Sequence, residues 1–343
     1  MNISTSRIQP SIITSFTVTG AAADLAKMPI ECLYIEVYAF MQSSMPCSTP
    51  ATADQGAVTH MAELYRQRRS EEVASWIIDA FPGKLVAAIA TFIPELTANP
   101  LEKGAIEDGE QALKLLIEVV RVLRSKNHPV NTIELVGGSC IQRVYRVASA
   151  RTPHQFLAHR LTRSQSMERL LDRLKSVAEY AFEPQPVFLS LELEPGPLFT
   201  LSDGNALLHF CANINNSSIP SLQRCVGLNL DIPHWQFLAG ITPDWLVNPN
   251  HLSVLERIVH AHVCDHHIAH FCDTVPGTFN DLAAFSRWFD LLQQIHTVKN
   301  KPGLPEFSGF VSCEMEACKD ERLLKSCFSR ISAAINASAP AIQ

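Results

Sequence analysis

The sequence predicts one α/β domain over residues 1–343, a single (β/α)8 barrel of the TIM type. Eight short apolar runs have the length and composition of β-strands, and segments with the three-and-four apolar spacing of helices separate them. No Gly-x-Gly-x-x-Gly follows the first run, so the main signature of an open dinucleotide-binding sheet is missing. Eight alternating units therefore favour a closed barrel, which commonly occupies about 250 residues or more as one domain.

The predicted strands should pair in parallel, because a helical crossover separates each strand from the next. The strands are residues 12–19, 30–39, 85–94, 131–137, 187–194, 226–233, 258–265 and 309–316. The clearest helical segments are residues 108–126, 164–181, 280–296 and 320–337, whereas the first unit offers only 21–28. Ser164 and Asp281 are predicted to cap two of these helices, because short polar side chains accept hydrogen bonds from free backbone N–H groups.

The composition is that of a globular protein with no basic surface for nucleic acid. Apolar residues make up 47% of the chain, charged residues 18%, and the formal net charge is -6. No stretch approaches the roughly 18 uninterrupted apolar residues that a membrane span requires. The first residues also lack the charged, apolar and cleavage segments of a signal peptide, so the cytoplasm is the expected location.

The ten cysteines raise the alternative of a disulfide framework. They are scattered, no Cys-x-x-Cys pair occurs, and several, including Cys32, Cys225 and Cys313, lie inside apolar runs. In a chain of this length such residues are expected to be buried, reduced thiols, which fits a reducing compartment.

Polar residues gather at the ends of the last four predicted strands, and the reactive groups of such barrels lie at these C-terminal ends. These residues are Glu192 and Glu194, Asp231 and His234, His260, His262, Asp265 and His266, and Glu314 and Glu316. Singly, each such glutamate reads as a salt-bridge partner and each such histidine as a satisfied core residue. Four consecutive strands with acids or histidines at one level point instead to a shared site.

Several carboxylates in one cavity would repel each other and lose hydration, which is costly unless they are protonated, paired or bound to a metal. A divalent cation held by oxygen and imidazole ligands removes this cost. The sequence therefore predicts a divalent-metal site at the mouth of the barrel.

The last 150 or so residues resemble the xylose-isomerase-like barrels, a superfamily of sugar isomerases, epimerases and related lyases that also includes endonuclease IV. The resemblance is carried by LELEPGP (191–197), VGLNLDIPH (226–234), IVHAHVCDHH (258–267) with PGTFND (276–281), and FSGFVSCEME (307–316). It implies Glu192, Asp231, His262 and Glu314 as ligands of Mn, Mg, Co or Zn. A register error of two residues would exchange Glu192 for Glu194 and Glu314 for Glu316.

The resemblance also implies which residues contact substrate: His234, Asp265 and His266. Alternatively, His234 supports the metal ligands, and Asp265 and His266 brace the site. Epimerases of the family usually carry an arginine shortly after the histidine of the seventh strand. Here HHIAHFC (266–272) supplies histidines instead, which departs from the residues that usually contact the sugar in this family.

The activity implied is that of a metal-dependent isomerase or epimerase acting on a small sugar or keto-polyol. Glu192 and Glu314 would remove and return a proton next to a carbonyl, through an enediolate that the metal stabilises. The alternatives are a dehydratase of the inosose or dehydroshikimate kind, which begins with the same proton abstraction, and a non-catalytic metal-binding barrel. Phosphodiester hydrolysis fits less well, because the chain is acidic. We expect no nucleic-acid or membrane partner, and a homo-oligomer is compatible with the sequence.

Overall fold

The computed structural model describes most of the chain, including at least part of every predicted strand. The described residues are 8–15, 32–36, 50–91, 103–136, 161–194, 199–265, 275–278, 280–298, 303–314 and 321–337.

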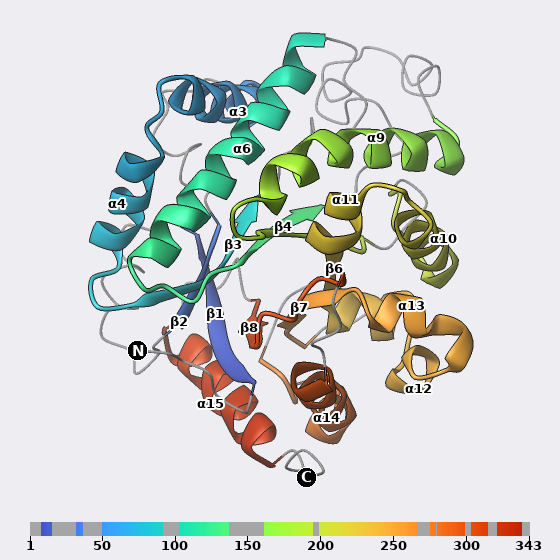
Figure 1. Cartoon of the computed structure of the whole chain (residues 1–343). Helices are drawn as coiled ribbons and strands as arrows, with labels where there is room; N and C mark the ends of the chain where they lie inside the picture. The colour runs from blue at the N-terminus through green and yellow to red at the C-terminus, as the bar shows by residue number, and fades with distance from the viewer. Residues whose placement is uncertain are drawn as a thin grey trace.

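Eight parallel strands form a closed barrel in sequence order, with β8 pairing back onto β1 (Figure 1). The strands are β1 Gln9–Ser15, β2 Cys32–Glu36, β3 Leu85–Thr91, β4 Thr132–Val136, β5 Phe188–Glu192, β6 Val226–Asp231, β7 Ile258–Val263 and β8 Phe310–Cys313. The predicted (β/α)8 barrel is therefore confirmed, and each predicted strand overlaps an observed one.

Strand β1 begins earlier than the apolar pattern predicts. It starts at Gln9 rather than at residue 12, because Gln9 pairs with Phe310 and donates its backbone N–H to the carbonyl of Gly309 at 2.7 Å. The sequence Gln-Pro-Ser has little intrinsic strand preference. Closure of the barrel against β8 supplies the partner that makes these residues extended.

Helices surround the barrel, and Figure 1 shows them as an outer ring. The longer ones are α3 Pro50–Arg66, α4 Ser70–Ala80, α6 Lys103–Ser125, α9 Arg163–Phe182, α10 Gly204–Asn215, α14 Leu282–Val298 and α15 Glu321–Ala337. Shorter elements are α11 Pro220–Cys225, the π-helix His234–Leu238, α12 Pro243–Leu246, the 3-10 helix Pro249–His251 and α13 Leu252–Leu255. Within the described ranges, no helix combines the length and apolar character needed to cross a bilayer. The predicted helix 21–28 lies outside the described residues.

The start of α9 corrects one predicted cap. Thr162, not Ser164, precedes the helix: its hydroxyl accepts the N–H of Gln165, and the Gln165 side chain accepts the N–H of Thr162. This reciprocal capping box satisfies two free N–H groups, which Ser164 inside the first turn cannot do. At the start of α14, the predicted cap Asp281 does accept the N–H of Ala283 at 3.0 Å.

Toward the ends of β5 to β8, side chains alternate between two environments, because successive strand residues point to opposite faces. One set is apolar and joins the core between strands and helices: Leu189, Leu191, Leu228, Leu230, Ala261, Val263, Val311 and Cys313. The other set is polar and buried: Ser190, Glu192, Asn229, Asp231, His260, His262 and Ser312. The alternation places the polar set together within the barrel, where the site forms.

Arg257, directly before β7, is a fully buried cation that joins α10, α11 and β6. Its Nε donates to Asn215 Oδ1 at 2.9 Å, and its Nη1 donates to the carbonyls of Gln223 and Val226 at 3.0 and 2.8 Å. Burial lowers the pKa of Arg257 to about 10, so it remains charged at neutral pH. This network fixes the bases of the two strands that carry Asp231 and His262.

The expectation of uniformly reduced cysteines is wrong at one pair. Cys313, at the end of β8, forms a disulfide with Cys327 of α15, with Cα atoms 6.8 Å apart. The pairing depends on the return of α15 onto the barrel, which no local cysteine spacing reveals. Cys211, Cys225 and Cys264 are buried thiols outside this disulfide, as predicted for Cys225.

Candidate metal centre

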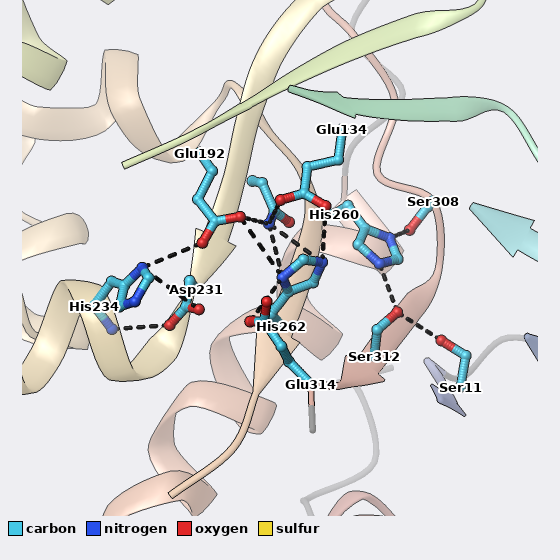
Figure 2. A network of polar contacts seen from close by, with 11 residues as sticks. Ser11, Glu134, Glu192, Asp231, His234, His260, His262, Ser308, Ser312 and Glu314 are labelled. Atoms are coloured by element: carbon cyan, nitrogen blue, oxygen red, sulfur yellow. Dashed lines mark hydrogen bonds and ion pairs between the residues drawn. The ribbon is translucent and has the colours of Figure 1, made fainter. Parts of the chain in front are cut away.

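Four side chains from four consecutive strands converge at the mouth of the barrel (Figure 2). Glu192 ends β5, Asp231 ends β6, His262 lies near the end of β7, and Glu314 directly follows β8. Each offers one ligand atom, and the four atoms lie within 4.8 Å of one another. The first three residues are buried and Glu314 is half-buried, with 13% of its side chain exposed.

The parallel pairing of the strands accounts for this convergence. Glu192 is in register with Asn229 on β6, and Asp231 is in register with His262 on β7. Glu314 lies two residues beyond Ser312, the residue in register with His262, and therefore on the same face of its chain segment as Ser312. Because each offset between neighbouring strands is zero or two residues, all four side chains keep to one face of the barrel wall and point at a common space.

Asp231 and His234 are tied together by the local chain. The sequence Asp-Ile-Pro-His leaves the strand and begins a helical turn, and Asp231 Oδ1 accepts the backbone N–H of His234 at 2.8 Å. This is the hydrogen bond of a helix cap, with proline favouring the first turn. It orients the carboxylate and places the imidazole of His234 beside the other acids.

The His234 ring lies between two of the predicted ligands. Its Nδ1 is 3.2 Å from Glu192 Oε1 and 3.6 Å from Asp231 Oδ2. Burial would lower the pKa of His234, but these two carboxylates outweigh it and raise the pKa to about 11. Burial likewise would raise the pKa of Glu192, but its interactions with Glu134, His234 and His262 outweigh it and lower the pKa. Without a metal, the His234 imidazolium therefore neutralises part of the acidic cluster.

His262 presents its two ring nitrogens to different carboxylates. Nδ1 is 3.2 Å from Glu314 Oε2 and 3.8 Å from Glu192 Oε2, whereas Nε2 is 3.6 Å from Glu134 Oε2. Burial lowers the pKa of His262, which favours the neutral imidazole that a metal requires.

Two buried residues of this network were not predicted from the sequence: Glu134 on β4 and Asn229 on β6. Asn229 Nδ2 lies 3.1 Å from Glu192 Oε2 and 3.3 Å from Glu134 Oε1, and it also contacts both ring nitrogens of His262. Both residues are polar positions inside apolar strands, Thr-Ile-Glu-Leu-Val and Gly-Leu-Asn-Leu-Asp. A polar residue inside an apolar strand is the sequence feature that indicates each of them. Attention to strand ends alone misses it.

His260 belongs to a separate buried chain of hydroxyls. Its Nδ1 lies 2.7 Å from Ser308 Oγ and its Nε2 lies 2.7 Å from Ser312 Oγ, which in turn contacts Ser11 Oγ at 2.7 Å. Burial lowers its pKa well below the ordinary value. His260 is thus a neutral core histidine with a partner on each nitrogen, which sets it apart from His262.

The other predicted site residues have different positions. Asp265 is fully buried, and its carboxylate accepts the backbone N–H groups of Thr278 and Asn280 at 2.8 and 3.1 Å and the Asn280 side chain. These bonds favour the bracing role over substrate contact. Glu194 forms a second cluster with Glu192 and His234, again with ligand atoms within 4.8 Å. His266 and Glu316 lie outside the described residues.

The donor set fits a divalent metal of the borderline to hard type. Three carboxylates and one imidazole, with no thiolate, suit Zn, Mn, Co or Mg rather than a copper or iron–sulfur centre. A dication would also compensate carboxylates that share a largely buried space. The residues present therefore fit the ion that the sequence predicted.

Comparison with solved structures identifies the fold. The chain matches the 1.8 Å structure of the IolI protein with a bound zinc atom, with a TM-score of 0.57 and 16% identity over 96% of this chain and 99% of that one. It matches L-ribulose 3-epimerase with a TM-score of 0.56 and 17% identity over 96% and 95% of the two chains. The chain has the xylose-isomerase-like barrel fold.

A D-allulose 3-epimerase from Methylomonas sp. in complex with D-allulose also shares the xylose-isomerase-like barrel, with a TM-score of 0.52 and 12% identity over 96% and 95% of the two chains. No family model and no curated protein sequence matches this chain. Because these identities are low, the likeness establishes the barrel, and the roles of individual residues rest on the site itself.

Proposed function

We propose that this chain is a metal-dependent isomerase or epimerase that acts on a small sugar or keto-polyol. The observation that carries the proposal is the convergence of Glu192, Asp231, His262 and Glu314 from four consecutive strands within 4.8 Å. The sugar epimerases and the zinc-bound protein among the structural neighbours support the same assignment.

A divalent ion held by these four residues would supply Lewis acidity to a substrate carbonyl and an adjacent hydroxyl. Glu192 and Glu314 come from β5 and from the end of β8 and approach His262 Nδ1 with one oxygen each, at 3.8 and 3.2 Å. A substrate between them would meet a carboxylate on each side. One carboxylate would take the proton from the carbon next to the carbonyl, and the other would return a proton.

His234 is placed to orient the substrate. Its side chain is 23% exposed, whereas the side chain of its partner Glu192 is 3% exposed, so the ring reaches toward the open side of the cluster. An N–H of this imidazole would donate to a substrate oxygen while the ring keeps its contact with Glu192. Truncation of His234 should therefore raise KM and also reduce kcat, because Glu192 loses a partner.

The test begins with metal analysis of the purified protein, followed by incubation with ketoses and keto-polyols in deuterated water. An isomerase or epimerase incorporates solvent deuterium without loss of mass from the carbon skeleton. A product lighter by one water would assign the chain to the dehydratases instead. Stoichiometric metal without deuterium incorporation from any compound would contradict turnover and leave a binding role.

The acid–base assignment is tested by Glu314→Gln, with Glu179→Gln on the exposed side of α9 as the matched control. We expect the site variant to lose at least about 100-fold in kcat, in line with general acid–base contributions, and the control to keep full activity. Full turnover by Glu314→Gln would show that another group moves the proton.

A further inference from the structure

We propose that Glu134 is a positioning residue that orients the metal ligand His262 and selects its tautomer. The inference rests on the proposed metal site and adds a fifth residue, a fourth carboxylate from β4, to the three acids and one histidine of the cluster. It follows from how the two ring nitrogens of His262 are divided between carboxylates.

Only one nitrogen of His262 faces the candidate metal position. Nδ1 lies 3.2 Å from Glu314 Oε2 and 3.8 Å from Glu192 Oε2, both ligands of the same cluster. Nε2 points to the other side and lies 3.6 Å from Glu134 Oε2 (Figure 2). An imidazole that binds a cation through Nδ1 must carry its proton on Nε2, whose polar neighbours are Asn229 Nδ2 at 3.3 Å and Glu134 Oε2 at 3.6 Å. Of these two, only the Glu134 carboxylate can accept that proton.

The fold holds Glu134 deeper in the barrel than the cluster itself. Glu134 is in register with Ser190, and the residue in register with Glu192 is Val136, two positions further along β4. The Glu134 side chain is 4% exposed, so it cannot swing out to solvent. It therefore approaches His262 from below the metal position, where it serves as a support and not as a substrate contact.

Asn229 fixes the orientation of the Glu134 carboxylate. Its amide nitrogen lies 3.3 Å from Glu134 Oε1 and 3.1 Å from Glu192 Oε2. Because Oε1 accepts a hydrogen bond from the amide, Oε2 faces His262 Nε2. The same amide separates Glu134 from Glu192, so two buried carboxylates stand close together with a shared donor.

A carboxylate behind a metal-bound histidine has two physical effects. It favours the tautomer whose lone pair faces the metal, and it makes that lone pair more basic. The separation of 3.6 Å is longer than a hydrogen bond, so charge attraction between the carboxylate and the polar N–H contributes the orientation. Loss of such a partner typically weakens metal binding by about 10–100-fold.

The experiment compares Zn²⁺ affinity of the wild type, Glu134→Gln and Glu179→Gln by titration against a competing chelator. Glutamine keeps the shape of the side chain and removes its charge, and Glu179 is exposed on α9. We expect Kd to rise by about 10–100-fold for Glu134→Gln only, with the thermal unfolding midpoint of the metal-free protein close to that of the wild type. A change of less than threefold would overturn the positioning role.

A second measurement does not depend on the Glu134 variant. Histidine ¹⁵N NMR of the Zn²⁺-loaded wild type, with the His262 signals assigned by loss in His262→Gln, should show the proton on Nε2 and none on Nδ1. A proton on Nδ1 would refute the inference. If the wild type itself binds no divalent metal, both the proposed function and the role of Glu134 fail. If the wild type binds Zn²⁺ tightly and Glu134→Gln binds it with the same Kd, only the role of Glu134 is refuted.

Discussion

Replacement of Asp231 by asparagine should abolish the stabilisation of this protein by metal while leaving the metal-free fold nearly intact. The structure explains why the two effects separate. Asp231 Oδ1 accepts the backbone N–H of His234 at 2.8 Å, and an asparagine oxygen can accept the same bond. The negative charge that would bind a dication and face the His234 imidazolium is lost.

The magnitude follows from binding linkage and chain size. Metal at 100 times its Kd stabilises the native state by about 2.7 kcal/mol. A chain of 343 residues has an unfolding entropy of about 0.7 kcal/mol/K, so the unfolding midpoint should rise by about 4 °C. If Asp231→Asn weakens binding by about 100-fold, the same metal concentration gives only about 0.4 kcal/mol and less than about 1 °C.

The assay is thermal unfolding followed by circular dichroism, with Zn²⁺ or Mn²⁺ added to protein stripped by a chelator. Asp172→Asn is the matched control, because Asp172 is an exposed carboxylate on α9 paired with Lys175. The control should show the full wild-type shift. An equal metal-induced shift in Asp231→Asn and in the wild type would place the metal elsewhere and refute the assignment of this ligand.

Three further predictions concern stability. Arg257→Met removes the donor from one buried and two partly buried acceptors. At about 1–3 kcal/mol for each acceptor, urea unfolding should show a loss of about 3–9 kcal/mol, unlike Arg287→Met at an exposed ion pair. Gly227→Ala would place its Cβ 2.1 Å from Val259 Cγ2 and 2.7 Å from a backbone carbonyl oxygen, and should lower the unfolding free energy by about 1–3 kcal/mol. Burial lowers the pKa of His128 below 6.5, and its Nδ1 accepts the N–H of Val86. Acidification below pH 6.5 should therefore reduce the unfolding free energy of the wild type more than that of His128→Asn. The His128 imidazole binds a proton more readily in the unfolded chain, so the unfolding free energy falls as pH falls. Equal losses in both proteins would contradict the assignment to His128.

The candidate ligands were accessible to sequence reasoning because their signal is local. Strand residues alternate between faces, so polar residues at every second position of an apolar strand mark the face that points into the barrel. Glu192, Asp231 and His262 stand out in this way, and Glu314 directly follows the fourth such strand. The barrel rule then places all four at one end without knowledge of the register.

The supporting residues were not accessible, because their roles depend on distances between distant parts of the chain. Glu134 and Asn229 are visible as polar interruptions. Only the strand pairing shows that Asn229 lies level with Glu192 and Glu134 two residues below it. The Cys313–Cys327 disulfide likewise depends on how α15 returns to β8. No spacing in the sequence encodes either arrangement.

The sequence by itself therefore determined the barrel and the chemical kind of the site, since strand periodicity and the placement of acids and histidines at strand ends are properties of short segments. Tertiary structure decided which nitrogen of His262 faces the cluster, which carboxylate stands behind it, and which cysteines are joined. These features depend on the stagger of neighbouring strands and on helix packing, which fix side-chain distances to within an ångström or so and are set by the closed barrel as a whole.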